Sequence, residues 1–231
     1  MKRFWKVAEV VAEGDGWAIR LDGRGVRTPA RAPLAVPSEA LARAMAEEWN
    51  AQGEEIDPAS MPMTGFANAT IDRVLPALGD FRGQVAAYAE SDLLCYRAGD
   101  PASLVARQQA EWDPLLDWAR ERFGVQFAVT AGMMPVDQPA RTLAALRGAV
   151  EALDPWLLAG VATLTQIGGS LVGTLALLHG ASTAEGLFDI ASLDERWQAE
   201  QWGEDEEATA RLALRRAEFL DAARYIALAQ G

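Results

Sequence analysis

The strongest constraint on the fold is a long apolar segment, residues 156–179, which could cross a lipid bilayer by length alone. Its centre carries polar side chains and two consecutive glycines, Gly168 and Gly169. Hydrocarbon penalises polar groups and interrupted helices most strongly at the middle of a membrane. No lysine or arginine flanks the segment closely enough to set an orientation. The pattern therefore predicts two core helices of a soluble protein, separated at the glycine pair, and no membrane insertion.

The composition fits a packed protein with an acidic surface. Hydrophobic residues make up 50% of the chain and charged residues 23%, which indicates a sizeable core. The chain has 21 Lys+Arg against 33 Asp+Glu, a formal net charge of −12. Nucleic acids and anionic lipids both require a basic surface, so this balance argues against either partner. The single cysteine, Cys95, excludes an intrachain disulfide and fits a reducing, cytoplasmic environment.

The first quarter of the chain has strand character. Residues 4–12 and 17–21 are rich in β-branched and aromatic side chains, and the glycine-containing stretch 13–16 predicts a hairpin turn between them. The first residues lack the long apolar core of a signal peptide, so we interpret them as the start of the first strand. Ser38 is a favourable N-cap for a helix that follows it.

From about residue 64 the pattern is helical. Asp113-Pro114 and Asp154-Pro155 each have the order of an N-cap followed by the first helical residue. Gly124 is placed to end the first of these helices. We therefore expect one helix over residues 114–123 and another that begins at Pro155.

Further helix starts are indicated by capping-box spacing. Ser182 with Glu185, and Ser192 with Glu195, place a hydroxyl three residues before a carboxylate. The last helix is expected over about residues 204–229, with its acids at the front, where the helix dipole favours them. Together these patterns predict an α+β protein: a small β-rich N-terminal domain over residues 1–75, then a mainly helical, orthogonal-bundle-like domain over residues 76–231.

The residues that common enzyme mechanisms need are largely missing. The only lysines are Lys2 and Lys6, so a Walker-type phosphate loop, which requires a lysine after its glycines, is excluded. Zinc sites of the usual types cannot be built from His179 and Cys95 alone. We expect His179 to cap the end of an apolar helix and Cys95 to be a small buried side chain. The sequence thus indicates no metal, no cofactor and no catalytic residue.

Two features near the C-terminus each leave two interpretations open. The acidic run 204–207 could supply paired carboxylates for acid–base chemistry, or it is the solvated start of a helix with a Glu207–Arg211 pair. Trp197 and Trp202 lie in a polar setting, which is typical of a protein-binding patch. They could equally be buried where one helix packs on the next.

Several short motifs occur in a fixed order along nearly the whole chain. In the first half they are Leu21-Asp22-Gly23-Arg24, Thr28-Pro29, Val36-Pro37, Ala46-Glu47-Glu48-Trp49, Gln52, Met61-Pro62-Met63-Thr64, Thr70-Ile71-Asp72, Asp92-Leu93-Leu94-Cys95-Tyr96-Arg97, Gln109 and Trp112-Asp113-Pro114. In the second half they are Leu193-Asp194-Glu195, Gln198, Trp202-Gly203, Asp205 and Glu207-Ala208. In this combination the chain resembles the family of assembly chaperones for the α subunit of mitochondrial and alphaproteobacterial F1-ATPase.

The resemblance implies a chaperone with neither catalytic activity nor cofactor. Its fold would be a small α+β domain joined to a helical C-terminal domain. It would bind the unassembled α subunit of F1-ATPase, prevent its aggregation and hand it to the β subunit. A monomeric protein of the bacterial cytoplasm is the form that we expect. The residues expected to contact the partner are Asp194, Glu195, Gln198, Trp202, Asp205 and Glu207.

Glu195 is the first of these to test, because its charge has no obvious partner nearby in the sequence. The alternative is that Glu195 only completes a capping box with Ser192. Two other functions remain open from the residues alone. One is a hydrolase or lyase that uses two carboxylates, and the other is a helical domain whose tryptophans line a cavity for a small ligand.

Overall fold

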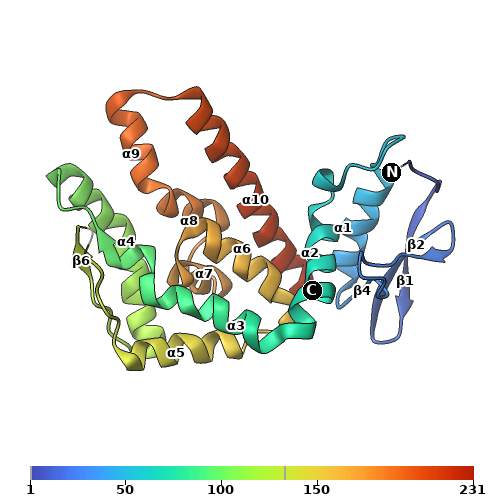
Figure 1. Cartoon of the computed structure of the whole chain (residues 1–231), viewed down its shortest axis with the longest axis horizontal. Coiled ribbons are helices and arrows are strands. Elements are labelled where there is room, and N and C mark those ends of the chain that lie inside the picture. Colours follow the sequence, from blue (N-terminus) through green and yellow to red (C-terminus); the bar gives the residue numbers. More distant parts are fainter. Residues whose placement is uncertain (1, 133) are drawn as a thin grey trace. The chain divides into compact units, whose positions relative to one another are not determined.

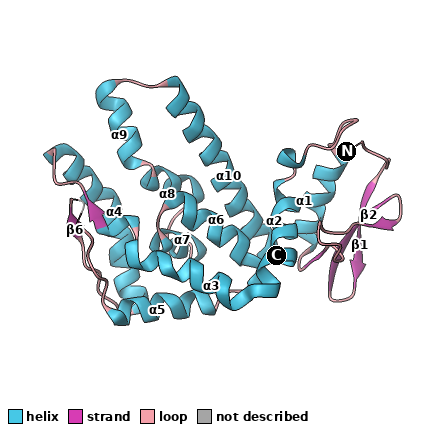
Figure 2. Cartoon of the chain, in the orientation of Figure 1, coloured by secondary structure: helices cyan, strands magenta, loops and turns pink. Residues whose placement is uncertain are grey.

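The structure is a computed structural model that describes residues 2–132 and 134–231. It contains two compact units (Figures 1 and 2). The first takes in the chain as far as Phe81, together with Asp154–Val161 and Asp221–Gly231, and the second comprises Arg82–Leu153 and Ala162–Leu220. The units are therefore discontinuous in the sequence, whereas the sequence analysis placed a single boundary after residue 75. Local patterns do not reveal that two later segments return to the first unit.

The first unit contains the predicted hairpin, with one helix packed on its sheet. Its regular elements are β1 (Ala8–Glu13), β2 (Gly16–Leu21), β3 (Arg24–Gly25), β4 (Ala35–Val36), α1 (Glu39–Asn50) and α2 (Pro62–Ala69). The hairpin strands β1 and β2 are antiparallel and in register from Ala8↔Leu21 to Glu13↔Gly16. Strands β3 and β4 both pair with β2.

Helix α1 begins as predicted. The Leu41 N–H donates to Ser38 Oγ at 3.1 Å, which satisfies one of the free amides at the helix start. Leu41 and Met45, which lie four residues apart on one face of this helix, are fully buried. The Ser38 hydroxyl also donates to the carbonyl of Leu228, near the chain's C-terminal end. The C-terminal part of the last helix thus closes one side of the first unit's core.

Two of the sequence motifs meet in this unit. The Thr28 hydroxyl donates to Asp72 Oδ1 at 2.6 Å, and the Ala30 N–H donates to Asp72 Oδ2 at 2.9 Å. Asp72 lies on a π-helical turn, Thr70–Val74, that continues α2. One carboxylate therefore fixes the loop that precedes β4.

The second unit is mainly helical. Its helices are α4 (Ala102–Phe123), α5 (Ala140–Glu151), α7 (Leu171–Leu178), α8 (Ala184–Ala191) and α9 (Leu193–Trp202), and α3 (Leu78–Ala87), α6 (Leu158–Gly168) and α10 (Glu206–Gln230) contribute residues to both units. A short parallel pair, β5 (Tyr96–Arg97) and β6 (Thr130–Ala131), completes it. The predicted fold class, a small N-terminal sheet region followed by helices, is confirmed.

The expected break in the apolar segment is confirmed. Helix α6 ends at Gly168, and Gly169 adopts φ +65°, a left-handed conformation that glycine tolerates best. Ser170 then caps α7 by accepting the Gly173 N–H at 2.8 Å. Within the described residues, no helix is both long enough and apolar enough to span a membrane.

One predicted helix start is wrong, a second is displaced by one residue, and at a third, Ser192, the helix begins as expected but without the capping bond. Asp113-Pro114 lies inside α4, which Gly124 ends as expected. Pro114 is on the exposed face of α4, while apolar side chains before and after it are buried, so packing outweighs the local preference of proline. Neither predicted capping box forms: α8 is capped by Thr183 instead of Ser182, and Ser192 makes no capping bond.

Candidate partner-binding site

The only cysteine and the only histidine of the chain are both packed against other side chains. Cys95 is fully buried, and burial raises the pKa of its thiol to about 12, so it remains protonated. His179 lies against the rings of Trp118 and Phe123, with ring centroids 5.8 and 6.3 Å away. Burial lowers the pKa of His179. The His179 N–H bonds the Leu175 carbonyl, so its backbone ends α7 as expected while its side chain packs on the aromatic rings.

Two acids with raised pKa values have structural tasks. Burial raises the pKa of Asp92 to about 6, and its carboxylate accepts the N–H groups of Leu94 and Val172. Burial also raises the pKa of Glu48, which accepts N–H groups at the start of α2. Both carboxylates therefore face backbone donors of the fold. No group of three or more His, Cys, Asp or Glu in the described chain could hold a metal ion.

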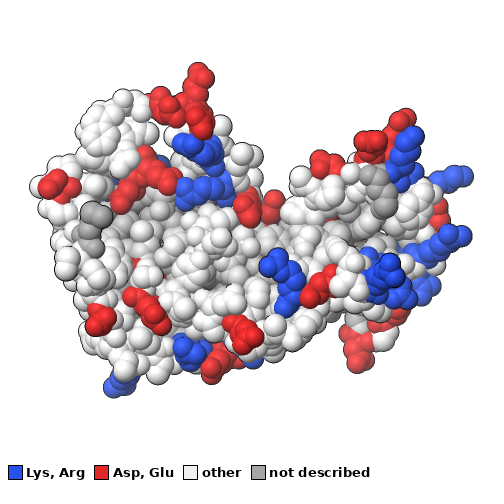
Figure 3. Space-filling view, viewed as in Figure 1, with Lys and Arg blue, Asp and Glu red and all other residues white. Residues whose placement is uncertain are grey.

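The surface feature of interest is a groove of about 700 Å³ between α9 and the first half of α10, within the second unit. Its lining residues are Glu195, Arg196, Gln198, Ala199, Glu200, Trp202, Gly203, Glu204, Asp205, Ala208, Thr209, Arg211, Leu212 and Arg215. Figure 3 shows acidic side chains gathered where α10 begins and basic ones further along that helix. The groove combines a charged rim with apolar side chains inside it.

The two tryptophans of α9 have different surroundings. Trp197 is buried and packs edge-to-face against Trp202, with ring centroids 5.5 Å apart. Trp202 itself is 74% exposed and lines the groove. Each of the two interpretations left open by the sequence thus applies to one tryptophan. Trp197 is buried in the helix packing, and Trp202 is exposed to solvent.

Glu195 has a charged partner that sequence reasoning missed. Its carboxylate contacts Arg215 Nη1 at 2.7 Å, which links α9 to α10 across the groove. Glu195 has no partner nearby in the sequence, as expected, but Arg215 supplies one from another helix, twenty positions later. The alternative, a capping box with Ser192, is wrong. Ser192 ends α8 as well as starting α9, and its hydroxyl donates back to the Phe188 carbonyl at 2.7 Å.

The remaining predicted contact residues occupy different positions. Gln198 is exposed and lines the groove. Asp205 also lines it, and its carboxylate accepts the Ala208 N–H at 2.7 Å, which caps α10. Glu207 is exposed beside the groove and forms the predicted pair with Arg211 at 2.8 Å. Asp194, like Glu207, does not line the groove, and it accepts a hydrogen bond from Gln108 at 2.7 Å.

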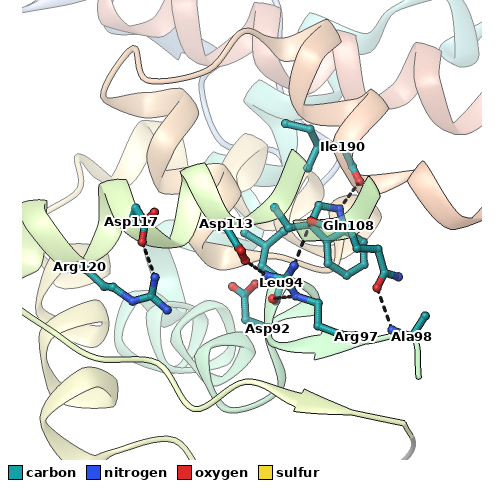
Figure 4. Close-up of polar contacts among 10 residues, drawn as sticks. Asp92, Leu94, Arg97, Ala98, Gln108, Asp113, Asp117, Arg120 and Ile190 are labelled. Carbon is teal, nitrogen blue, oxygen red and sulfur yellow. Dashed lines mark hydrogen bonds and ion pairs between the residues drawn. The ribbon is translucent and has the colours of Figure 1, made fainter. Parts of the chain in front are cut away.

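Gln108 belongs to a buried polar network with Arg97 and Ala98 (Figure 4), and its side chain also bonds Asp194 of α9. Only 1% of Gln108 is exposed, and its Oε1 accepts the Ala98 N–H at 2.8 Å while its Nε2 donates to Asp194. The Arg97 guanidinium donates to the Gln108 carbonyl at 3.0 Å and to Asp113 at 2.7 Å. A side-chain amide thereby joins β5 and α4 to the first turn of α9.

Sequence reasoning overlooked Gln108, although a signal was present. Leu104, Gln108 and Trp112 recur every four residues, so the glutamine lies on the buried stripe of α4. A buried amide requires partners for both its oxygen and its nitrogen. The identity of those partners could not be inferred, because Asp194 is 86 positions away.

Comparison with known proteins finds relatives that match nearly the whole chain. The sequence profile described as ATP12 chaperone protein matches residues 2–120. The structure of Atp12 from Paracoccus denitrificans is 42% identical, with a TM-score of 0.95 over 99% of this chain and 98% of that one. This chain belongs to the ATP12 chaperone family. The expected family resemblance is thus confirmed, and with it a role as a chaperone in ATP synthase F1 assembly.

Two further proteins are similar to this chain. The Atu1473 protein of Agrobacterium tumefaciens is 43% identical, with a TM-score of 0.93 over 97% of this chain and 85% of that one. The mitochondrial protein atp12 of Schizosaccharomyces pombe is 23% identical over 224 residues, which cover 90% of this chain and 75% of the yeast protein. The structural matches include α9 and α10, which lie beyond the region matched by the family profile.

Proposed function

We propose that this ATP12 family member binds the unassembled α subunit of F1-ATPase, prevents its aggregation and releases it to the β subunit. The observation that carries the proposal is the exposed Trp202 at a charged groove, in a chain with the ATP12 fold. Large aromatic side chains that a monomer leaves exposed are typical of protein-binding surfaces. We further propose that the chain acts as a monomer in the bacterial cytoplasm.

The mechanism requires contact alone. An unassembled ring subunit exposes apolar surface that its neighbour later covers, and such surface promotes aggregation. A chaperone that covers this surface holds the subunit in solution. Release follows when the β subunit forms the tighter contact, and each difference of about 1.4 kcal/mol in binding free energy favours the exchange tenfold. Neither ATP hydrolysis nor a cofactor is needed.

The predicted contact residues fall into two groups, those that could touch the partner directly and those that hold the groove in shape. We propose that Glu195, Gln198 and Trp202 touch the partner, because they line the groove and are exposed. Glu207 contributes charge beside the groove. Asp194 and Asp205 act on its shape: the first holds the start of α9 through Gln108, and the second caps α10.

The first experiment measures light scattering from isolated α subunit diluted out of denaturant, without nucleotide. The protein should suppress scattering at about equimolar concentration and form a complex with the α subunit on a sizing column. Isolated β subunit serves as the specificity control. Aggregation that proceeds unchanged would contradict the proposal, as would equal protection of both subunits.

The second experiment tests the site with matched variants. Trp202→Ala should weaken binding of the α subunit by at least about 30-fold, as expected for a central aromatic contact. Leu214→Ala is its control, since Leu214 is 73% exposed on α10 but does not line the groove. Glu195→Gln keeps the side-chain size and removes the charge that faces Arg215. If Glu195→Gln and Trp202→Ala both bind like the parent, the groove is not the contact surface.

A further inference from the structure

The segment that forms α9 and leads into α10 carries an unusual concentration of negative charge, and the groove that it borders is also lined by Arg196, Arg211 and Arg215. Residues 194–207 contain seven acids and one arginine, a net charge of −6, which is half of the formal charge of −12 of the whole chain. Like charges this close together repel one another, so the folded protein gains from a cationic partner at this position.

Most of these acids already have partners within the protein. Four ion pairs or hydrogen bonds account for them: Glu195 with Arg215, Glu200 with Arg107, Glu207 with Arg211, and Asp194 with Gln108. A fifth acid, Asp205, caps α10.

Glu204 and Glu206 differ from the rest of the run. Both are exposed where α9 leads into α10, and neither forms an ion pair or a side-chain hydrogen bond among the described residues. Glu204 lines the groove, and Glu206 is two positions further on, in the first turn of α10. Negative charge is therefore left uncompensated at one end of the groove.

An apolar surface adjoins these carboxylates. Trp202 is separated from Glu204 by one residue and presents a ring that is 74% exposed. The half-buried Leu212 lines the same groove from α10. A tryptophan face also attracts a Lys or Arg cation within about 6 Å of its centroid. Carboxylates, an indole and a leucine are thus combined in one concave surface.

We propose that this groove binds a segment of the client in which a Lys or Arg side chain adjoins a large apolar side chain. The cation lies by Glu204 and Glu206, and the apolar side chain packs on Trp202 and Leu212. The inference rests on the proposed function, since it describes the part of the unassembled α subunit that the chaperone recognises. The uncompensated charge beside an exposed indole is the reason to choose this chemistry, and 700 Å³ is room for several side chains.

The test compares two double variants with the same change in net charge. Glu204→Gln with Glu206→Gln removes the two uncompensated carboxylates. Glu185→Gln with Glu218→Gln is the control, because both residues are exposed on the same unit and do not line the groove. Binding to isolated α subunit should weaken about 3- to 10-fold in the first variant and remain within about 2-fold in the control. The first variant should also show a smaller loss of affinity with added salt.

A set of overlapping synthetic peptides that spans the α subunit supplies an independent readout. The parent protein should retain peptides with Lys or Arg beside an aromatic or aliphatic residue, and the Glu204→Gln, Glu206→Gln variant should retain them less. Equal weakening in both double variants would overturn the inference, as would retained peptides without a basic residue. Sedimentation of the parent protein alone also tests the inference. If the parent is a dimer and the Glu204→Gln, Glu206→Gln variant is a monomer, the groove binds a second copy of this chain and the inference is overturned. Failure of the parent to bind any form of the α subunit would instead refute the proposed function.

Discussion

Replacing Gln108 by leucine tests whether the buried amide holds α9 in place. Leucine keeps most of the side-chain volume, but it removes the acceptor of the Ala98 N–H and the donor to Asp194. A buried polar group left without its partner costs about 1–3 kcal/mol. Ala98 and Asp194 are only half-buried, so water replaces part of each loss. The free energy of unfolding should therefore fall by about 2–4 kcal/mol.

The assay is urea unfolding followed by tryptophan fluorescence and circular dichroism, with linear extrapolation to water. Gln109→Leu is the matched control, because it makes the same change one position along α4 on an exposed side chain. It should change stability by no more than about 0.5 kcal/mol. A double-mutant cycle of Gln108→Leu with Asp194→Ala should give a coupling energy of about 1–2 kcal/mol. If Gln108→Leu matches its control, or if the coupling is zero, the reasoning about α9 is refuted.

Three further changes test other contacts. Gly16→Ala should lower stability by about 1–3 kcal/mol, because its Cβ would lie 2.7 Å from the Val36 carbonyl oxygen; wild-type stability in a urea melt would contradict this. Thr28→Val should cost about 1–3 kcal/mol by removing the donor to Asp72, and a cost that persists unchanged when Asp72 is alanine would argue against that bond. Burial raises the pKa of Asp92 to about 6 from an ordinary 3.8, so between these pH values the folded protein holds a proton that the unfolded chain releases. Lowering the pH from 7 to 5 should therefore stabilise the parent by about 1 kcal/mol relative to Asp92→Asn, and a difference that stays constant with pH would refute it.

Local sequence signals predicted much of the fold. Ser38 caps α1, Gly124 ends α4, and the glycine pair 168–169 divides the apolar segment as expected. Each of these signals acts within a few residues through a conformation or a hydrogen bond that the chain must satisfy locally. The approximate extents of the second strand and of the last helix followed for the same reason, whereas the first strand begins at Ala8, four residues later than predicted.

Signals that depend on distant contacts were misread or missed. Pro114 lies within α4 because the buried faces on either side of it outweigh the loss of one helical hydrogen bond. Ser192 has capping-box spacing, yet two helices meet at this residue and its hydroxyl turns back to α8. The partner of Glu195 lies on another helix, so no local spacing could identify Arg215. The groove itself exists only once α9 and α10 are placed.

Hydrogen exchange of the chaperone, alone and in complex with isolated F1-ATPase α subunit, tests the central claim most directly. The claim is that α9 and the first half of α10 form the surface that shelters the client. We predict slower amide exchange in peptides that cover residues 193–212 when the complex forms, with little change in α5. Protection confined to the β1–β2 hairpin, or none in α9 and α10 at saturating α subunit, would contradict it.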